Sequence, residues 1–228
     1  DLIIKPKNSS AYLDANGKSQ VFDVKNGKTL ILEDITIKNG QAQDGKPGGG
    51  AAVWGRCTLI MKGSSTITNC KASYGGGVYI DNGGTLIMKD SSTITNCEAD
   101  DGGGVYVDGT FKMEGGAIVT PSTGSDKNEK GKNDVDLENG KTVTVTGALS
   151  HTPAARITPY SYTDGRVLAT GAAEKANFKV TPQDGNKYWR FKKQGGEVKF
   201  VPAKLKVTFN KIKCVEVEDA SSEAEYYW

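Results

Sequence analysis

Apolar and polar residues alternate along much of this chain, in short runs separated by turn residues. Between residues 75 and 101 the alternation covers three runs, 78–80, 85–88 and 93–96. A period of two is typical of β-strands that bury one face. No window shows an apolar period near 3.6 residues, so the sequence predicts almost no helix.

The same pattern returns at a fixed interval. Gly48, Gly75 and Gly102 each begin a copy, at intervals of 27 residues. The first copy reads GGGAAVWGRCTLIMKGSSTITNCKASY, the second GGGVYIDNGGTLIMKDSSTITNCEADD, and the third GGGVYVDGTFKMEGGAIVTP. Residues 1–47 contain an earlier and less regular version. A fixed period in this range indicates a repeat architecture.

Three short strands per copy cannot bury an apolar face alone, but stacked copies can, with equivalent strands paired in parallel about 4.8 Å apart. The sequence therefore predicts an all-β fold: a right-handed, single-stranded parallel β-helix with three short strands per coil. Leu59 would stack on Leu86 and Phe111. An antiparallel sandwich or a propeller is the alternative, but propeller blades need about 40 or more residues per repeat.

The chain divides into two predicted parts. Residues 1–201 form the β-helix, in which the polar tract 122–134 is expected to be a solvated excursion from one corner. Residues 188–200 would form a last hairpin or coil edge. Pro202 and Ala203 mark a boundary, and residues 202–228 are either the start of a following β domain or a C-terminal strand that packs on the helix.

Two sets of repeated residues have structural interpretations. Asn39, Asn69 and Asn96 end the third strand of their copies, where stacked amides would bond along a column and cap bent backbone. Cys70 and Cys97 occupy the same place in successive copies. They predict either a stack of buried free thiols or a disulfide between neighbouring coils.

Charge and apolar run length exclude several classes of partner. Lys and Arg total 29, Asp and Glu total 27, and the net charge is +2. The chain has no basic stripe, which argues against nucleic acid. The longest apolar runs are a few residues, so no segment would span a membrane. The chain begins at Asp1 without a signal-like segment, and we expect it to be a mature or excised part of a longer protein.

Aromatic residues are the candidates for ligand binding. Tyr79 and Tyr106 should point outward from the same strand on adjacent coils and stack on each other. Trp54 lies two positions past their equivalent, Ala52, and so on the same face. Exposed aromatics on a flat, rigid sheet suit recognition of sugar or protein. The alternative is a cross-strand aromatic pair that only shields the sheet.

Several repeated motifs carry a resemblance to known proteins. The Gly-Gly-Val-Tyr units at 76–79 and 103–106, the Thr-Leu-Ile-Met strands and the terminal asparagine resemble the pectin-lyase-like right-handed parallel β-helix superfamily. More narrowly, they resemble the glycine-rich repeats of bacterial surface proteins, including polymorphic outer-membrane-protein repeats. The element 93–96 departs from those repeats because it lacks their aromatic residue. The resemblance covers about residues 15–200 and implies a secreted or surface-exposed bacterial protein, often an adhesin or a binding stalk.

The same superfamily contains polysaccharide lyases and hydrolases, and hydrolysis by the usual route needs two carboxylates. Asp100 and Asp101 are the candidates for such a pair, and solvated corner charges are the alternative. The chain lacks the paired-Asp, His-Gly and Arg-x-Lys set of polygalacturonases and the Arg-x-Pro-type motif of pectate lyases. The sequence therefore assigns no catalytic residue.

Cofactor sites are equally sparse. No CxxC occurs and His151 is the single histidine, which argues against a zinc site. There is no phosphate loop, catalytic triad or cofactor fingerprint. The sequence predicts no cofactor, although calcium would suit oxygen ligands from the corner carboxylates Asp81, Asp100, Asp101 and Asp108.

These observations favour a non-catalytic module of an extracellular surface protein, used for adhesion or as a display stalk. Its partner would be a host or matrix protein, or a glycan. The expected location is secreted, or at the cell surface in association with the outer membrane. The alternative function is a lyase acting on a uronate polymer, or a glycoside hydrolase.

Overall fold

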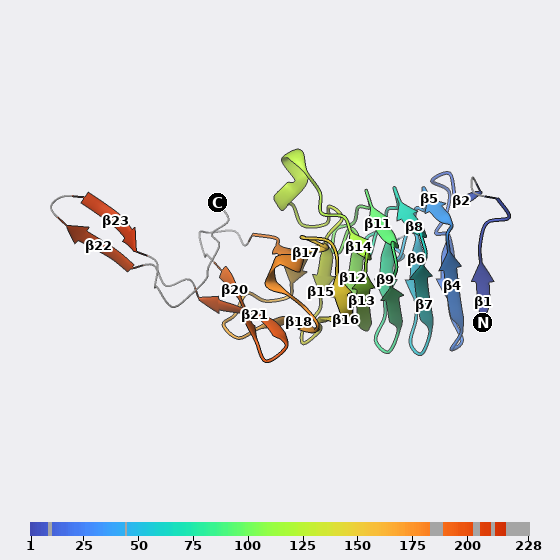
Figure 1. Ribbon diagram of the computed structural model, residues 1–228. Helices are drawn as coiled ribbons and strands as arrows, with labels where there is room; N and C mark the ends of the chain where they lie inside the picture. Colours follow the sequence, from blue (N-terminus) through green and yellow to red (C-terminus); the bar gives the residue numbers. More distant parts are fainter. Residues whose placement is uncertain (9–10, 44, 183–188, 203–205, 211–212, 218–228) are drawn as a thin grey trace.

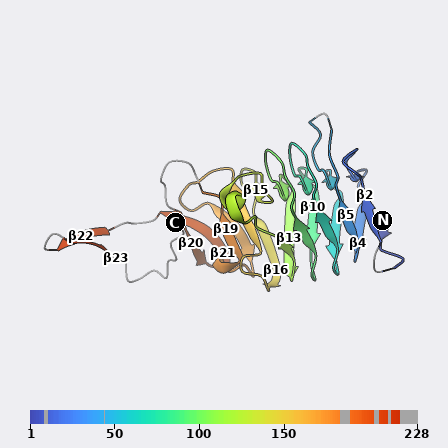
Figure 2. The ribbon, with the colours of Figure 1, turned by 90° about the horizontal axis from the view of Figure 1, so that it is seen from above.

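The chain folds into an all-β solenoid of about 7 turns in which 4% of the residues are helical. The computed structural model describes residues 1–8, 11–43, 45–182, 189–202, 206–210 and 213–217. Coil follows coil along one axis from the N-terminus (Figure 1), and the view from above shows the same succession of stacked strands (Figure 2). The predicted parallel β-helix is confirmed.

Three sheets form the walls of the solenoid, and their strands pair in parallel with the equivalent strands of neighbouring coils, except for the last two strands of the first sheet. The first sheet contains, in spatial order, β1 (Leu2–Ile4), β4 (Thr29–Glu33), β7 (Thr58–Lys62), β10 (Thr85–Met88), β13 (Thr110–Gly115), β16 (Val143–Leu149), β18 (Val167–Gly171), β21 (Glu197–Pro202) and β20 (Trp189–Gln194). The second contains β14 (Ile118–Val119), β11 (Thr93–Thr95), β8 (Thr66–Thr68), β5 (Thr36–Lys38) and β2 (Tyr12–Asp14). The third contains β19 (Phe178–Val180), β17 (Ala155–Pro159), β15 (Val135–Leu137), β12 (Val105–Val107), β9 (Val78–Ile80), β6 (Ala51–Val53) and β3 (Phe22–Val24).

The core is a set of aliphatic ladders that run along the solenoid axis. Leu59 pairs with Leu86, which pairs with Phe111, and all three are fully buried. A second ladder joins Val53, Ile80 and Val107 in the third sheet. Because alternate residues of each strand point inward, every coil adds one rung to each ladder. The predicted register of the copies is confirmed.

The asparagine corner exists, and its role is in the backbone. Asn39, Asn69 and Asn96 have φ values of 55°, 53° and 54°, in the left-handed region that asparagine tolerates better than most residues. The amide of Asn39 donates to Asp14 Oδ1 at 2.9 Å. In the described part of the chain, no side-chain hydrogen bond joins these three asparagines to one another, so the predicted amide column is wrong while the bent-backbone role is confirmed.

The repeated cysteines are free thiols stacked inside the solenoid. Cys70 and Cys97 are both buried, and neither forms a disulfide. Each thiol donates to a carbonyl two residues earlier, Thr68 O and Thr95 O, at 3.3 Å. Burial raises the pKa of Cys97, which keeps its thiol protonated. The free-thiol interpretation is confirmed and the disulfide alternative is wrong.

The polar tract 122–134 is only partly the solvated excursion that its composition predicts. It contains the short 3₁₀ helix η1 (Gly124–Asn128), which has no buried residue, but residues 133 and 134 are buried. Asn133 Oδ1 accepts from Cys97 N at 3.0 Å, and its Nδ2 donates to Thr120 O at 2.6 Å. The end of the tract therefore replaces a corner of the next coil, because its side chains satisfy backbone groups that the interrupted repeat would leave unpaired.

The solenoid ends on an antiparallel hairpin. Strand β21 pairs antiparallel with both β18 and β20. Of the two forms predicted for residues 188–200, a hairpin or a coil edge, the hairpin is confirmed, and residue 188 lies outside the described residues. The short 3₁₀ helix η2 (Lys175–Asn177) lies before β19. Farther along, β22 (Lys206–Asn210) and β23 (Lys213–Val217) form a two-stranded sheet of their own. The assignment of residues 202–228 to a following domain or to a packing strand stays a prediction.

Within the described residues, no helix has the length and apolar character needed to cross a membrane.

Candidate binding face

The candidate functional residues lie on the outer side of the third sheet. Parallel pairing places one residue per coil in a single row that crosses the sheet. Its members are the central, outward residues of β3, β6, β9, β12 and β15, followed by the fourth residue of β17: Asp23, Ala52, Tyr79, Tyr106, Asp136 and Thr158. Strict register along the row follows from the pairing of equivalent backbone positions in every coil.

Four aromatic rings form a continuous strip on this face, which we call the aromatic strip: Trp54, Tyr74, Tyr79 and Tyr106. Tyr79 and Tyr106 stack, with centroids 5.4 Å apart and planes 12° apart. Trp54 lies against Tyr79 at 5.7 Å. Tyr74 meets Tyr106 edge to face at 5.4 Å and is 43% exposed. The predicted grouping of Trp54, Tyr79 and Tyr106 is confirmed.

Tyr74 was not predicted as part of this group. It belongs to the turn before the glycine triplet of the second copy, and its backbone bridges to Asp101 of the next coil. The first and third copies have other residue types at this position, so the repeat gave no aromatic signal there. Its place one residue before Gly75, in the turn that leads into β9, is the signal that would have found it.

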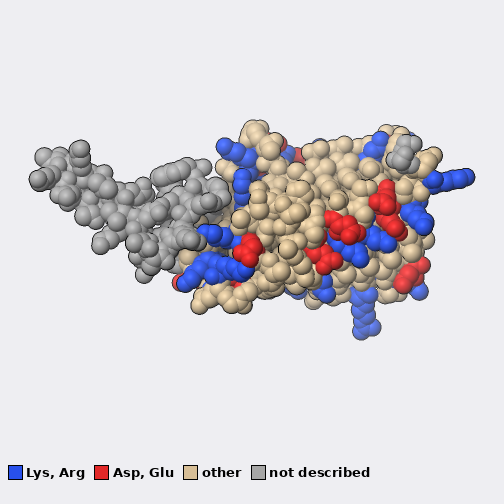
Figure 3. Space-filling model, in the orientation of Figure 1, with Lys and Arg blue, Asp and Glu red and all other residues tan. Residues whose placement is uncertain are grey.

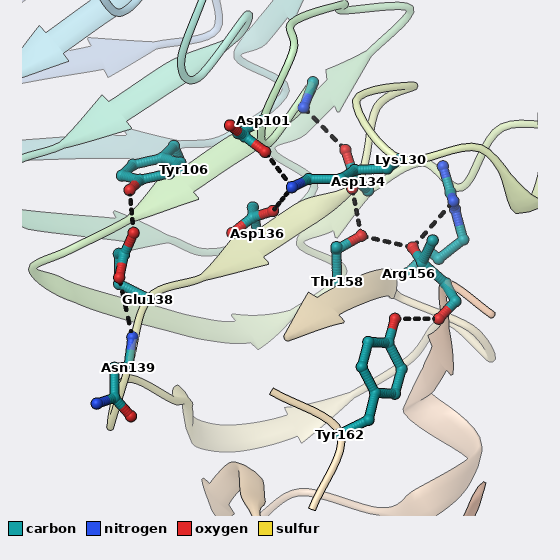
Figure 4. Close-up of polar contacts among 12 residues, drawn as sticks. Asp101, Tyr106, Lys130, Asp134, Asp136, Glu138, Asn139, Arg156, Thr158 and Tyr162 are labelled. Atoms are coloured by element: carbon teal, nitrogen blue, oxygen red, sulfur yellow. Dashed lines mark hydrogen bonds and ion pairs between the residues drawn. The ribbon is translucent and has the colours of Figure 1, made fainter. Parts of the chain in front are cut away.

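Carboxylates hold the polar ends of these rings. Trp54 Nε1 donates to Asp23. Tyr106 Oη donates to Glu138, as Figure 4 shows. Burial, followed by the neighbouring carboxylate of Asp81, raises the pKa of Tyr79. Burial and the hydrogen bond to Glu138 raise the pKa of Tyr106 further. Both phenols are therefore neutral at any physiological pH, and their rings are fixed in position.

A line of carboxylates borders the strip where the strands of the third sheet end. Asp81, Asp108 and Glu138 directly follow β9, β12 and β15 and occupy equivalent places on successive coils. We call them the carboxylate rim. Asp81 accepts from Gly55 N at 3.3 Å, and Asp108 lies 3.5 Å from the ammonium of Lys141.

On the opposite border of the strip, a lysine lies between two carboxylates (Figure 4). The ammonium of Lys130 forms an ion pair with Asp101 and lies 3.7 Å from Asp136 Oδ2. Burial raises the pKa of Asp136 to about 7, although the charge of Lys130 acts in the other direction. Asp136 therefore changes its charge near neutral pH, directly beside Tyr106 in the row.

Behind Lys130, a buried polar network fastens the tract 122–134 to the solenoid (Figure 4). The guanidinium of Arg156 is 1% exposed and donates to Lys132 O at 2.7 Å and to Thr181 Oγ1 at 3.0 Å. Thr158 Oγ1 donates to Asp134, and Tyr162 Oη donates to Thr181 O. This network is not predictable from the repeat pattern, because its members are separated by 19 residues or more and lie outside the clear repeats.

The carboxylates considered for calcium and for catalysis lie at two different corners of the coils, with Asp81 and Asp108 directly after β9 and β12, and Asp100 and Asp101 directly before a glycine triplet. Asp101 is joined through Lys130 to Asp136, and not to Asp100. Among the residues with described positions, no group of three or more His, Cys, Asp or Glu side chains is placed to hold a metal ion.

A shallow hollow of about 260 Å³ lies elsewhere, at the asparagine corner of the first coils. It is open to solvent and is lined by Asn16, Gly17, Asn39, Gly40, Gln41, Asn69 and Lys71. Its lining contains no aromatic or apolar anchor, unlike the aromatic strip.

Neither a scan of protein-family models nor searches of curated proteins and of solved structures find a match to this chain.

Proposed function

We propose that this protein is a non-catalytic binding module of an extracellular bacterial surface protein, and that the aromatic strip contacts its ligand. The observation that carries the proposal is the run of four touching rings on the outer side of one sheet. Tyrosine and tryptophan are enriched where proteins meet their partners, because each buries a large apolar area and keeps a polar tip.

The solenoid supports this proposal because it makes the strip rigid. Every strand beneath the rings is hydrogen-bonded to two neighbouring coils, and the inward residues Val78, Ile80, Val105 and Val107 are fully buried. Rings that are already ordered lose little conformational entropy when a ligand binds. A stalk that displays other domains and a module that adheres to a host or matrix protein, or to a glycan, both use such a body.

The extracellular location is part of the same proposal. It is supported by the resemblance of the glycine-rich copies to repeats of bacterial surface proteins, and by the elongated form of the solenoid, which extends a surface away from its point of attachment. Secretion or display in association with the outer membrane is the form that we propose. We also propose that this chain is related to the pectin-lyase-like right-handed parallel β-helix superfamily.

A second candidate function is cleavage of a polysaccharide, for which one observation speaks. Asp136 has a pKa of about 7 and lies with Asp101 on either side of Lys130, next to the aromatic strip. A carboxyl that titrates near neutral pH suits general acid–base chemistry. However, Asp136 is only 7% exposed and Asp101 is already paired, so neither carboxylate is free to reach a glycosidic bond.

Binding to a glycan array and to a panel of extracellular-matrix proteins tests the main proposal. The variants Tyr79→Thr and Tyr106→Thr keep a residue that favours β-structure and remove the rings. Tyr12→Thr is the matched control, because Tyr12 is 56% exposed on the second sheet and lies outside the strip. We expect the two strip variants to lose binding and the control to keep it.

Depolymerisation assays on uronate and neutral polysaccharides decide between the two candidates. Cleavage by the wild-type protein that disappears in Asp101→Asn or Asp136→Asn would replace the binding function with the enzymatic one. Ligand binding that survives loss of both rings would place the binding site elsewhere on the solenoid.

A further inference from the structure

The carboxylates around the aromatic strip exceed the cations that neutralise them. The carboxylate rim lies along one border, Asp101 lies on the other, and Asp136 continues the row beyond Tyr106. The cations in ion pairs with these carboxylates are Lys130 and Lys141. Among the described residues, Asp81 and Glu138 take part in no ion pair; they accept hydrogen bonds from Gly55 N and from Tyr106 and Asn139. The whole chain has a net charge of +2, so this negative excess is local.

The charges are mixed on the face of the molecule that Figure 3 shows. Acidic and basic side chains are interspersed there, with neighbouring charges of opposite sign. Pairs such as Glu33 with Lys62, at 3.1 Å, account for this mixing on the first sheet. Elsewhere among the described residues, Asp34 and Asp90 also take part in no ion pair and accept backbone hydrogen bonds. The aromatic strip differs because its carboxylates stand beside stacked aromatic rings.

The ammonium of Lys25 lies on this face and shows how a cation of a ligand could bind there. Lys25 follows β3 and pairs with Asp23 at 2.6 Å, and its ammonium lies 5.7 Å from the centroid of the Trp54 ring. Lys25 and Trp54 stand at the first two positions of the column that continues with Asp81, Asp108 and Glu138. An ammonium held by one carboxylate beside one ring is therefore a local arrangement that this face supports.

From this arrangement we infer that the ligand of the aromatic strip is a basic, extended segment of polypeptide whose Lys or Arg side chains meet the rings and the carboxylate rim. The inference rests on the proposed binding function and names its partner class. A cation near an aromatic ring is attracted by the ring quadrupole, most strongly where water is excluded. Carboxylates beside the ring add charge-assisted hydrogen bonds and select against partners of like charge.

The geometry also says what the strip rejects. Equivalent carboxylates on successive coils lie about 4.8 Å apart, so an anionic polymer laid along the strip would face a line of negative charges. The inference therefore predicts that uronate polymers and sulfated glycans do not bind to the strip. A neutral glycan could stack on the rings, but it would leave the rim without a role in binding.

Fluorescence anisotropy with four labelled probes tests the inference. The probes are an alternating Lys-Ala peptide, a Glu-Ala peptide of the same length, a neutral cello-oligosaccharide and an oligogalacturonate. We expect saturable binding of the Lys-Ala peptide alone, weakened by added salt. The double variant Asp81→Asn/Asp108→Asn should weaken it about tenfold, as should Tyr79→Thr. The control Glu33→Gln/Glu114→Gln, which removes the same charge from the first sheet, should leave it unchanged.

Each other outcome overturns a defined statement. Equal weakening by the rim variant and the first-sheet control would mean attraction by total charge, and the inference would fail. Binding of the neutral oligosaccharide that depends on Tyr79 but not on Asp81 and Asp108 would overturn the basic ligand and keep the proposed function. Binding of any probe that is unchanged in Tyr79→Thr would overturn both.

Discussion

The ring of Tyr79 lies flat against the ring of Tyr106 on the next coil, with 5.4 Å between centroids and 12° between planes. The two residues are directly opposite each other in the parallel pairing of β9 and β12. Stacked pairs of this kind contribute about 0.5–1.5 kcal/mol beyond the area they bury. The contact is thus both a candidate ligand surface and a source of coupling between coils.

A double-mutant cycle should detect that coupling. We expect Tyr79→Thr and Tyr106→Thr to be less destabilising together than the sum of their separate effects, by about 1 kcal/mol. Urea unfolding followed by circular dichroism measures the four free energies. Strict additivity would mean that the stacking contributes nothing to the stability of the solenoid.

The position of Asp136 predicts a pH dependence of stability. Its pKa is about 7 in the folded protein against 3.8 for the free side chain, because burial disfavours the charged form. The folded state therefore holds the proton more tightly, and the contribution of Asp136 to the free energy of unfolding is largest below about pH 4. It declines by about 2–4 kcal/mol as pH rises toward 7, and is constant above that.

The variant Asp136→Asn isolates this effect, because an amide does not titrate. Thermal unfolding of both proteins between pH 4 and pH 8 should give a difference in melting temperature that grows in favour of the variant as pH rises. Parallel pH profiles for the two proteins would contradict the pKa of Asp136. Asp90→Asn, at an exposed corner, is the control for a general effect of removing a negative charge.

The left-handed backbone conformation of Asn96 predicts how its substitutions rank in their effect on stability. Its φ of 54° is costly for a residue with a β-carbon and no local hydrogen-bonding group, so Asn96→Ala should destabilise by about 1–2 kcal/mol. Asn96→Gly should cost little, because glycine adopts positive φ without strain. Chemical denaturation of the two variants measures the difference, and a glycine variant as unstable as the alanine variant would assign the cost to the side chain.

Asn133 should be less tolerant than Asn96. It has a similar φ of 50°, but its side chain also bonds Cys97 N and Thr120 O in a buried place. Loss of those bonds leaves buried backbone groups unpaired, at about 1–3 kcal/mol. We therefore expect Asn133→Gly to be strongly destabilising where Asn96→Gly is not. The rate of hydrogen exchange at the backbone amide of Cys97 should rise in Asn133→Gly and stay unchanged in Asn96→Gly.

The buried thiols predict slow chemical modification. Cys70 and Cys97 are buried, and burial raises the pKa of Cys97, so iodoacetamide should label their peptides only after unfolding. Mass spectrometry of the labelled peptides measures this without reference to other cysteines. A peptide linked through Cys70 and Cys97 under non-reducing conditions would contradict the free-thiol stack.

The repeat explains which features the sequence could predict. Leu59, Leu86 and Phe111 share one position of the copies, and parallel stacking turns a shared position into a spatial contact. Tyr79 and Tyr106 were placed together by the same reasoning. The repeat does not predict the contacts of the side chains that border these two tyrosines, because contacts such as that of Lys130 with Asp101 depend on a tract without any equivalent in the other coils.

Arg156 illustrates the limit most clearly. Nothing in its neighbourhood in the sequence marks it as buried, and an isolated arginine is usually solvated. Its burial depends on the carbonyl of Lys132 and the hydroxyl of Thr181, which lie 24 and 25 residues away. The polar tract 122–134 shows the same limit. Its composition predicts a solvated excursion, but composition does not reveal which of its side chains replace missing backbone partners.

In-register stacking has a consequence for how such a protein changes over generations. Residues 75–101 form one full turn that carries Tyr79, Asp81, Asn96 and Cys97 in positions equivalent to those of its neighbours. Unequal recombination within the gene that duplicates this segment would lengthen the solenoid by about 4.8 Å and leave every ladder intact. Each event would add one tyrosine to the aromatic strip and one carboxylate to the carboxylate rim, so that the length of the solenoid and the number of proposed contact positions would grow together in whole steps.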